Sequence, residues 1–286
     1  QGPAQRVEAY AERLRERLPP AARITEVRVE DLIPLAEEGF RIAESGSADY
    51  DFPPIPPDLA LCPDCRRELL DPADRRYLYP FGACTQCGPR YTIVERTPFD
   101  RETTAMVDFP LCPACRAEYE DPRNRRFRAQ ASSCPACGPH LRLLDASGRE
   151  RPGDPLGGAI EAVRAGAVVA IRGLGGYHLA ADPRNEATLR RLRRDKERER
   201  KPFALMVRDL EVAARLCAPG ALDRAAAAEL ASERSPILIL PARDPQALRL
   251  VSDTGTLGVF LPYTALHLLL FRHPACRAAD ALVMTS

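Results

Sequence analysis

Four Cys-x-x-Cys pairs constrain the fold of this chain more than any other feature of its sequence. The first two pairs are separated by eighteen residues, as are the last two, and the second set follows the first at an interval of fifty residues. The intervening sequence repeats as well, since CPDCRRELLDPADRRYLYPFGACTQCGP aligns with CPACRAEYEDPRNRRFRAQASSCPACGP without a gap. Such a repeat indicates two copies of one structural unit. The cysteines are Cys62, Cys65, Cys84, Cys87, Cys112, Cys115, Cys134 and Cys137.

This spacing predicts zinc binding. Two thiolates in a tight Cys-x-x-Cys turn occupy two corners of a tetrahedron, and a second pair supplies the other two. The repeat therefore predicts two structural Zn²⁺ ions with no open coordination position. A disulfide framework and a redox motif are the alternatives, disfavoured by the expected cytosolic location and by the four copies. The spacing leaves open whether neighbouring pairs share an ion or whether the first and last pairs do. Cys217 and Cys276 stand alone, and we expect buried, inert thiols there.

The composition indicates a hydrophobic core and a mixed surface. Hydrophobic residues make up 45% of the 286 residues, and charged residues make up 28%. The 41 basic and 40 acidic residues leave a formal charge of +1, so no global field attracts nucleic acid or an anionic membrane. No apolar run approaches the roughly 18 residues of a membrane span, and the first residues lack the apolar core of a signal peptide. We therefore expect a cytoplasmic protein, and the ends of the chain indicate a piece of a longer one.

The sequence pattern divides this multidomain α/β protein into four segments. Residues 1–46 contain a helix pattern over 4–18 and two short strand patterns within 19–33 and 39–45, about half of a small α/β sandwich. Residues 47–60 read as an extended, proline-rich linker. Residues 61–145 hold the cysteine repeat. Residues 155–286 alternate strand and helix patterns, which indicates an open α/β sheet. The expected helices there are 159–166, 185–196, 209–217 and 264–271, and the expected strands are 167–172, 202–207, 235–240, 256–261 and 281–286.

A dense run of charge over residues 193–201 begins at the end of the second of these helices and contains Lys196 and Lys201, the only lysines in the chain. In the simpler interpretation, arginines of a solvated helix face extend into water. Those arginines are Arg190, Arg191, Arg193 and Arg194. That interpretation does not explain why positive charge continues past the helix. An ammonium group is a compact point charge suited to a polyphosphate, whereas a guanidinium is a planar fork. Lys196, Arg198 and Lys201 are therefore candidate polyphosphate ligands.

A glycine loop and several hydroxyl groups complete the candidate site. Gly173, Gly175 and Gly176 allow close approach of a ligand to the backbone. The dinucleotide-binding pattern fails, however, because His178 stands where the third glycine belongs, and the loop lacks the lysine of a P-loop. A tight turn is the alternative. Hydroxyl side chains at strand ends are commonly caps or turn formers. They occur here at Thr264, Thr285 and Ser286.

Several motifs together resemble the HypF carbamoyltransferases, which mature [NiFe] hydrogenases. They are CTQCGPRYTI, CPACGP, AIRGLGGYHLA, KERERKPFALM, LGVFLPYTALHLLLF and LVMTS, in the same order over nearly the whole chain. The resemblance implies that residues 1–46 are the end of an acylphosphatase-like domain, whose catalytic Arg and Asn would precede Gln1. It implies a tandem zinc-finger domain over residues 61–145 and an incomplete, twisted YrdC-like nucleotide-binding sheet over residues 155–286. A Kae1-like domain would follow.

The resemblance also implies a reaction. Carbamoyl phosphate is cleaved to carbamate, which the YrdC-like domain joins to ATP, with Mg²⁺, as carbamoyl-adenylate. The Kae1-like domain then passes the carbamoyl group to the C-terminal cysteine of the partner HypE, where it becomes the cyanide ligand of the hydrogenase iron.

The resemblance assigns residues to this ATP site. Lys196 and Arg198 match the family's Lys-x-Arg and, with Lys201, neutralise the triphosphate. Ser286 matches the serine that opens a Ser-x-Asn nucleotide motif. The implied ATP or carbamoyl-adenylate site comprises Arg172, Gly173, Gly175, Gly176, His178, Lys196, Arg198, Lys201, Pro262, Tyr263, Thr264, Thr285 and Ser286.

The chain departs from the family pattern at three positions. Arg172 stands where the family often has Lys, Arg128 replaces a usual His, and Ala265 replaces a Pro. Two other functions are considered. A threonylcarbamoyl-adenylate synthase of tRNA modification shares the YrdC-like domain but needs no tandem zinc module. A non-catalytic scaffold or nucleic-acid-binding module is disfavoured because acidic residues balance the basic ones.

Overall fold

The computed structural model describes residues 4–16, 18, 22, 24, 26–27, 55–276 and 279–286 of the chain. The chain divides into two compact units, Gln1–Pro54 and Ile55–Ser286, which are described separately. In the first unit, helix α1 (Ala4–Glu16) forms where the apolar spacing predicts a helix. The strands expected within 19–33 and 39–45 fall largely, and linker residues 47–54 entirely, outside the described residues.

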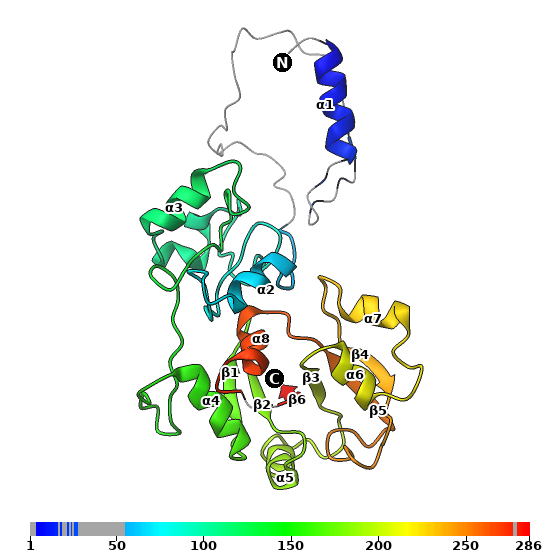
Figure 1. Ribbon diagram of the computed structural model, residues 1–286. Helices are drawn as coiled ribbons and strands as arrows, with labels where there is room; N and C mark the ends of the chain where they lie inside the picture. The colour runs from blue at the N-terminus through cyan, green and yellow to red at the C-terminus, as the bar shows by residue number, and fades with distance from the viewer. Residues whose placement is uncertain are drawn as a thin grey trace. The chain divides into compact units, whose positions relative to one another are not determined.

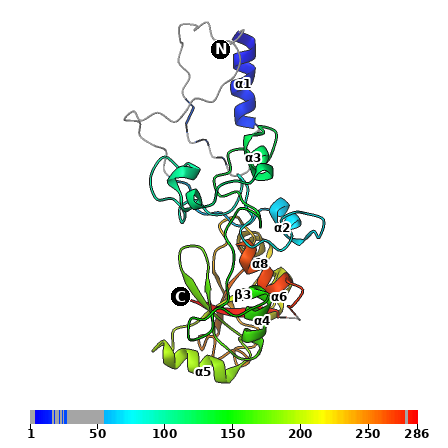
Figure 2. The ribbon, with the colours of Figure 1, turned by 90° about the vertical axis from the view of Figure 1, so that its left-hand side faces the viewer.

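The second unit begins with the cysteine repeat (Figures 1 and 2). Each copy opens with a short helix, α2 (Pro63–Leu70) in the first copy and α3 (Pro113–Glu120) in the second. The first cysteine of each copy is the N-cap and proline follows it, so the fixed φ of proline starts the helix directly after the first zinc-ligand candidate. The short helices η1 (Arg101–Thr103) and η2 (Ala105–Asp108) lie between the copies in sequence.

The two copies of the repeat also share a left-handed backbone conformation at equivalent positions. Leu78 has φ 55° and Arg128, fifty residues later, has φ 54°. The backbone N–H of Leu78 donates to the carbonyl of Leu69, and that of Arg128 donates to the carbonyl of Tyr119, again fifty residues apart. The side chain of Arg128 lies over the ring of Tyr119, 5.4 Å from its centroid. Position 128 therefore forms the same left-handed turn as Leu78, a role that needs no imidazole.

The remaining residues of the second unit form an α/β domain around a six-stranded sheet in the order β1-β2-β6-β3-β5-β4. Strands β3 and β5 are parallel, and the other neighbouring strands are antiparallel. The strands are β1 (Val169–Arg172), β2 (Tyr177–Ala181), β3 (Ala204–Val207), β4 (Leu238–Pro241), β5 (Thr256–Phe260) and β6 (Ala281–Thr285). The helices are α4 (Pro155–Arg164), α5 (Glu186–Asp195), α6 (Leu210–Leu216), α7 (Arg224–Leu230) and α8 (Ala265–Arg272).

The elements predicted for residues 155–286 are confirmed, but the pattern missed β2 and α7. The glycine loop turns the chain back on itself, because the N–H of Gly173 donates to the carbonyl of Gly176 at 2.8 Å. Gly175 adopts φ 79°, which favours glycine, and β2 returns antiparallel to β1. The loop is therefore a hairpin turn, the alternative considered above. Helix α7 is an alanine run whose N-cap, Asp223, accepts from the N–H of Ala226.

Side-chain alternation along the strands creates one core on each face of the sheet. Met206 packs with α4 and α8, whereas its neighbour Leu205 packs on the opposite face with α5, α6 and α7. The cysteine module joins the first of these cores through Leu69 of α2, which is 3% exposed and lies among residues of α8. The cysteine module and the α/β domain therefore share one hydrophobic interior. Among the described helices, none is long and apolar enough to cross a membrane.

Leu69→Ala tests this shared interior. Removing a buried leucine leaves a cavity, so we expect the free energy of unfolding to fall by about 2–5 kcal/mol in denaturant titrations. The control is Leu144→Ala, because Leu144 is 48% exposed and its truncation is expected to change the free energy by less than about 0.5 kcal/mol. Equal stability of the two variants would contradict the shared core.

Candidate zinc centres and nucleotide site

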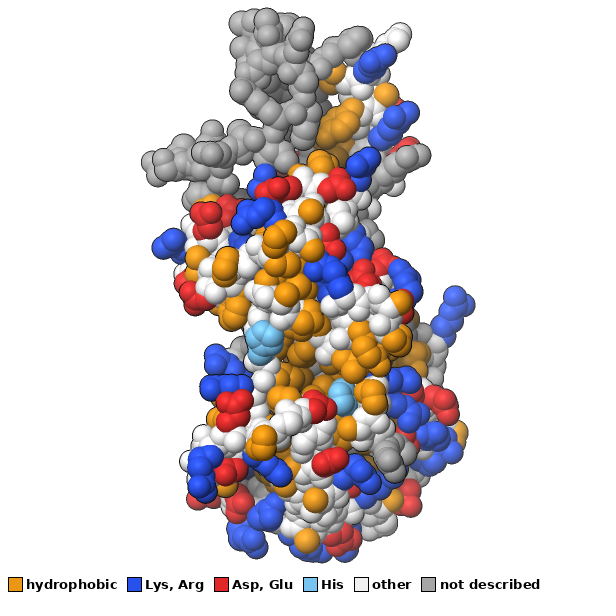
Figure 3. Space-filling view, turned by 60° about the vertical axis from the view of Figure 1, so that its left-hand side comes forward, with side chains coloured by type: hydrophobic (Ala, Val, Ile, Leu, Met, Phe, Trp, Pro, Cys, Tyr) orange, Lys and Arg blue, Asp and Glu red, His pale blue; other side chains and the backbone are white. Residues whose placement is uncertain are grey.

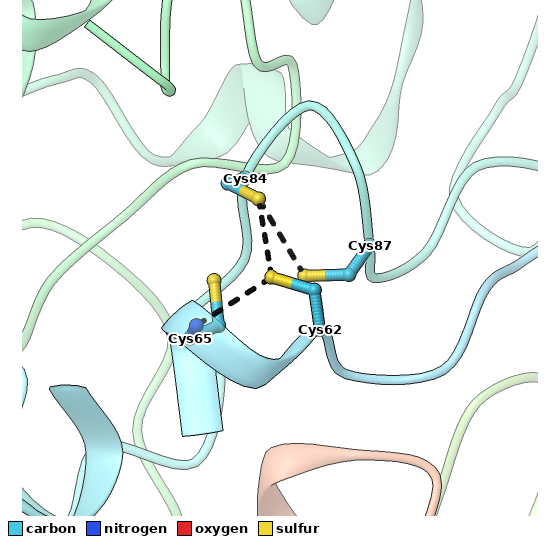
Figure 4. Close-up of side chains that lie close together, drawn as sticks. All are labelled: Cys62, Cys65, Cys84 and Cys87. Atoms are coloured by element: carbon cyan, nitrogen blue, oxygen red, sulfur yellow. Dashed lines mark hydrogen bonds between the residues drawn. The ribbon is translucent and has the colours of Figure 1, made fainter. Parts of the chain in front are cut away.

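Neighbouring Cys-x-x-Cys pairs come together, which resolves the pairing that the spacing left open. The Sγ atoms of Cys62, Cys65, Cys84 and Cys87 lie within 4.8 Å of one another (Figure 4). The same holds for the second set: Cys112, Cys115, Cys134 and Cys137. All eight thiols are free of disulfide bonds.

The distances within each cluster fit a tetrahedral zinc ion. Zn–S bonds of about 2.3 Å place the corners of a tetrahedron about 3.8 Å apart. In the first cluster, the Sγ of Cys84 lies 3.7 Å from that of Cys62 and 3.8 Å from that of Cys87. In the second, the Sγ of Cys134 lies 3.8 Å from that of Cys112 and 3.7 Å from that of Cys137. Four thiolates of this geometry suit one Zn²⁺ per cluster and leave no coordination position for catalysis.

Each cluster receives arginines from the other copy of the repeat. Arg125 of the second copy donates from Nη1 to the Sγ of Cys65, 3.2 Å away, in the first. Arg75 of the first copy donates from Nη2 to the Sγ of Cys115, 3.3 Å away, in the second. A zinc ion with four thiolates carries a net charge of about −2, so these guanidinium groups stabilise the thiolate form that binds metal.

Arginines of each copy also form ion pairs with a glutamate of the other copy. Arg125 and Arg126 pair with Glu68, and Arg75 and Arg76 pair with Glu118. Burial acts to raise the pKa of Glu68, but the hydrogen bonds from Arg126 and Arg125 lower it to about 2. One arginine of each pair is buried, since Arg76 and Arg126 are each 3% exposed, and the two carboxylates are partly buried. The two copies are therefore interlocked by crossed ion pairs, each with a buried arginine.

Glu68→Ala tests the interlock, because it leaves Arg126 as a buried cation without its carboxylate. Breaking one side of a buried pair typically costs about 3–5 kcal/mol, and we expect a loss of that size in chemical unfolding of the zinc-loaded protein. Glu120→Ala is the matched control, since Glu120 forms an exposed i,i+4 pair with Arg116 and its loss is expected to cost less than about 1 kcal/mol. A similar loss in both variants would count against the crossed pairs.

A cavity of about 530 Å³ lies on the α8 face of the central strands. That volume falls in the range of small-molecule sites. Strands β2, β6, β3 and β5 supply its floor, and segments outside the sheet close it. Its lining residues are Asp58, Leu59, Ala60, Leu174, His178, Arg198, Pro202, Ala204, Glu233, Arg234, Ser235, Ile237, Phe260, Tyr263, Met284, Thr285 and Ser286. Figure 3 shows hydrophobic side chains gathered between the cysteine module and the α/β domain.

Several residues predicted to bind nucleotide converge at this cavity. Arg198 donates from Nη1 to the Oγ1 of Thr285, 2.7 Å away, and Lys196 donates from Nζ to the backbone carbonyl of Ser286. Two cationic side chains that follow α5 thus meet the end of β6, almost ninety residues later in the chain. His178 and Tyr263 line the same cavity.

Other predicted residues lie elsewhere. Arg172, Gly175 and Gly176 are exposed and do not line the cavity, nor do Gly173 and Pro262. Lys201 is exposed and also lies outside the lining. Thr264 is the N-cap of α8, where its Oγ1 accepts from the N–H of His267 at 3.0 Å. Thr264 is therefore a helix cap, which was the alternative considered for the hydroxyl side chains at strand ends.

Arg193 corrects one prediction. It was expected to extend into water with its helix neighbours, but its guanidinium donates to the backbone carbonyls of Arg198, Glu199 and Lys201. Nε also donates to the carbonyl of Leu250 at 2.9 Å, and the guanidinium carbon lies 4.6 Å from the centroid of the Phe203 ring. Arg193 therefore holds the loop that carries the candidate polyphosphate ligands. The helix pattern alone could not separate it from the exposed arginines beside it.

The lone cysteines also differ in part from expectation. Cys217 is buried, and burial raises the pKa of its thiol, as expected of an inert group. It is the C-cap of α6 rather than a residue within the helix. Cys276 follows α8 and is only half-buried.

His267 is a buried histidine that sequence reasoning missed. It is fully buried in α8, its ring centroid lies 4.6 Å from that of Tyr263 and 5.6 Å from that of His178, and neither ring nitrogen has a hydrogen-bond partner among the described residues. Burial, with a smaller contribution from the charge of His178, lowers the pKa of His267 to about 3. The imidazole is therefore neutral at physiological pH.

This buried imidazole predicts a pH dependence of stability. The unfolded chain binds a proton at His267 below about pH 6.5, whereas the folded chain does not until about pH 3. The neutral, buried imidazole therefore makes its full contribution to the free energy of unfolding above about pH 6.5, and that contribution is lost as the pH falls toward 3. We expect His267→Leu to flatten the fall in unfolding free energy between pH 7 and pH 5, by up to about 1.4 kcal/mol per pH unit. His140→Leu, at an exposed histidine, is the control. An unchanged slope in His267→Leu would contradict the assignment.

Comparison with known proteins agrees with this organisation. The model of the HypF finger family matches residues 61–94 and 111–144, and that of the Sua5/YciO/YrdC family, described as telomere recombination, matches residues 161–286. The carbamoyltransferase HypF2 of Cupriavidus necator is 48% identical over 283 residues, and the carbamoyltransferase HypF of Rhodobacter capsulatus is 45% identical over 281. Each alignment covers 97% of this chain, but only 35% and 36% of the respective relative.

Solved structures give the same result. A full-length HypF crystallised in a phosphate- and nucleotide-bound form matches with a TM-score of 0.91 and 37% identity, and HypF of T. kodakarensis matches with 0.88 and 42%. Each match covers 100% of this chain and 36% of that structure.

The fold and the two clusters define a protein in which a duplicated four-cysteine zinc-finger module is joined to a YrdC-like α/β domain. Within that class, the chain belongs to the HypF family. It spans about a third of the length of the relatives that it matches.

Proposed function

We propose that this chain is the zinc-finger and nucleotide-binding part of a carbamoyltransferase of [NiFe]-hydrogenase maturation. In this proposal it forms carbamoyl-adenylate from ATP and the carbamate released from carbamoyl phosphate. The carbamoyl group then passes to the C-terminal cysteine of a HypE-type maturation protein for synthesis of the cyanide ligand. Relatives named carbamoyltransferases and the nucleotide-bound HypF of the same fold support the proposal.

The observation that carries the proposal is the convergence of Lys196 and Arg198 at the end of β6, where the cavity begins. Arg198 lines the cavity and Lys196 lies beside Ser286, which does so too. The acceptor of Arg198 is the neutral hydroxyl of Thr285, so Arg198 forms no ion pair in this contact. Its positive charge is therefore available to phosphate oxygens.

The proposed chemistry is an in-line displacement. A carbamate oxygen attacks the α-phosphorus of ATP, and a new P–O bond forms as the bond to the bridging oxygen of the β-phosphate breaks. Pyrophosphate leaves with the electron pair, and carbamoyl-adenylate remains. Negative charge moves onto the leaving pyrophosphate, so cations fixed near it stabilise the transition state more than the ground state. Mg²⁺ enters with ATP as part of the substrate. The backbone contacts of Arg193 fix the loop that carries Arg198, which limits reorganisation during the reaction.

The zinc clusters have a structural role in this proposal. Each has four thiolate donors, so no position is left for a water or a substrate.

Lys196→Arg tests the assignment in ATP–pyrophosphate exchange with the full-length, zinc-loaded protein. The planar guanidinium keeps the charge but not the point-donor geometry, so we expect carbamoyl-phosphate-dependent exchange to fall about 10²-fold with an unchanged melting temperature. Arg190→Lys is the matched control, because Arg190 is exposed and pairs with Glu186 on the same helix.

The same assay separates the two adenylation reactions. Exchange that requires carbamoyl phosphate supports the proposal, whereas exchange supported by threonine plus bicarbonate alone would favour the threonylcarbamoyl-adenylate alternative. Full exchange activity in Lys196→Arg would show that Lys196 is not a polyphosphate ligand.

A further inference from the structure

The two copies of the repeat differ just before their first cysteine. The first copy opens with DLALCPDC and the second with DFPLCPAC, so Asp58 matches Asp108 and Ala60 matches Pro110. Alanine has a backbone N–H and proline does not. The first copy can therefore donate a hydrogen bond at a position where the second cannot.

Residues 58–61, here called the strap, use that difference to tie the first copy to the cavity. The N–H of Ala60 donates to the carbonyl of Glu233 at 2.9 Å, and the N–H of Leu61 donates to the carbonyl of Tyr263 at 2.9 Å. Glu233 and Tyr263 both line the cavity, and the strap residues Asp58, Leu59 and Ala60 line it too. The strap therefore forms one wall of the cavity and is hydrogen-bonded to two other walls.

The strap is in turn held by the segment that follows the last cysteine of the first cluster. Leu59 and Gly88 exchange backbone hydrogen bonds of 3.1 and 2.9 Å, and Gly88 directly follows Cys87. Gly88 has φ 88°, and a Cβ there would lie 2.6 Å from that of Ala83, so the position requires glycine. The carboxylate of Asp58 accepts from the backbone N–H groups of Arg90 at 2.7 Å and Thr92 at 3.2 Å.

The equivalent segment of the second copy makes different contacts. The N–H of Phe109, which matches Leu59, donates to the carbonyl of Met106, and the carbonyl of Phe109 accepts from Arg101, so both groups bond to residues between the two copies. Asp108 is exposed. The copies therefore diverge where the first one meets the cavity.

We propose that the strap is a positioning element of the nucleotide site, and that the first zinc cluster, but not the second, braces it. Resting on the proposed function, this inference adds that ATP affinity depends on two features of the first copy. One is the N–H of Ala60, which fixes the wall at Glu233. The other is the acceptor oxygen of Asp58, which fixes the strap to the segment after Cys87.

The test is the dissociation constant for ATP, measured by titration calorimetry on the full-length, zinc-loaded protein without carbamoyl phosphate. Ala60→Pro introduces the residue of the second copy and removes one donor, and Asp58→Ala removes the acceptor. We expect each to raise the dissociation constant about tenfold, while the zinc content stays at that of the wild type. Asp58→Asn retains an acceptor oxygen and is expected to keep most of the affinity. Asp108→Ala, the matched change in the second copy, is expected to have no effect.

Each outcome decides the inference. Affinities of Ala60→Pro and Asp58→Ala within about twofold of the wild type would overturn it. If Ala60→Pro does not fold, the two Asp58 variants decide. Loss in Asp58→Ala with recovery in Asp58→Asn supports a positioning role, whereas equal loss in both shows that an acceptor oxygen at position 58 does not suffice for ATP affinity and overturns the brace as stated. A wild type that binds no ATP would refute the proposed function itself, which distinguishes that failure from failure of the strap.

Discussion

The charge of the two cysteine clusters is the constraint on which the rest of this structure depends. Four thiolates around a divalent ion concentrate negative charge in a small volume, and each copy of the repeat supplies the arginines that face the cluster of the other. Because these contacts cross, the duplicated unit folds as one body rather than as two independent fingers. That body carries α2, whose Leu69 enters the core beside α8. The zinc module is thereby part of the α/β domain's interior rather than an appendage.

The candidate nucleotide site follows from this arrangement. The central strands offer a floor of mixed polarity, but the walls come from a loop after α5, the segment before β4 and the strap ahead of the first cysteine pair. The strap is hydrogen-bonded through backbone groups to Glu233, in the segment before β4, and to Tyr263, so the positions of these walls depend on the fold and not on side-chain identity alone. Lys196 and Arg198 lie where β6 ends, and the neutral hydroxyl of Thr285 holds Arg198, which leaves its charge for a polyphosphate.

The sequence predicted the regular elements well where local patterns are strong. The elements expected in residues 155–286 form as predicted because their apolar spacing matches burial on a defined face. Strand β2 was missed because its five residues follow a glycine loop that also fits a ligand-binding turn. Arg193 was misassigned because helical periodicity reports which residues face the core, but not which neighbouring carbonyls a long side chain can reach. Arg172 was included in the site through family motifs, and Gly175 and Gly176 already through the pattern of the glycine loop, and the hairpin leaves all three exposed.

The sequence by itself determined the eight zinc-ligand candidates, the duplication and the positions of Lys196 and Arg198, because each is a pattern of residue types at short range. Tertiary structure alone decided which cysteine pairs share a centre, that arginines cross between copies, and that Asp58 to Ala60 line the cavity rather than forming a plain linker. Those facts depend on distances between residues remote in the chain. Spacing along a sequence contains no such distances, and only the packed core and the buried ion pairs fix them.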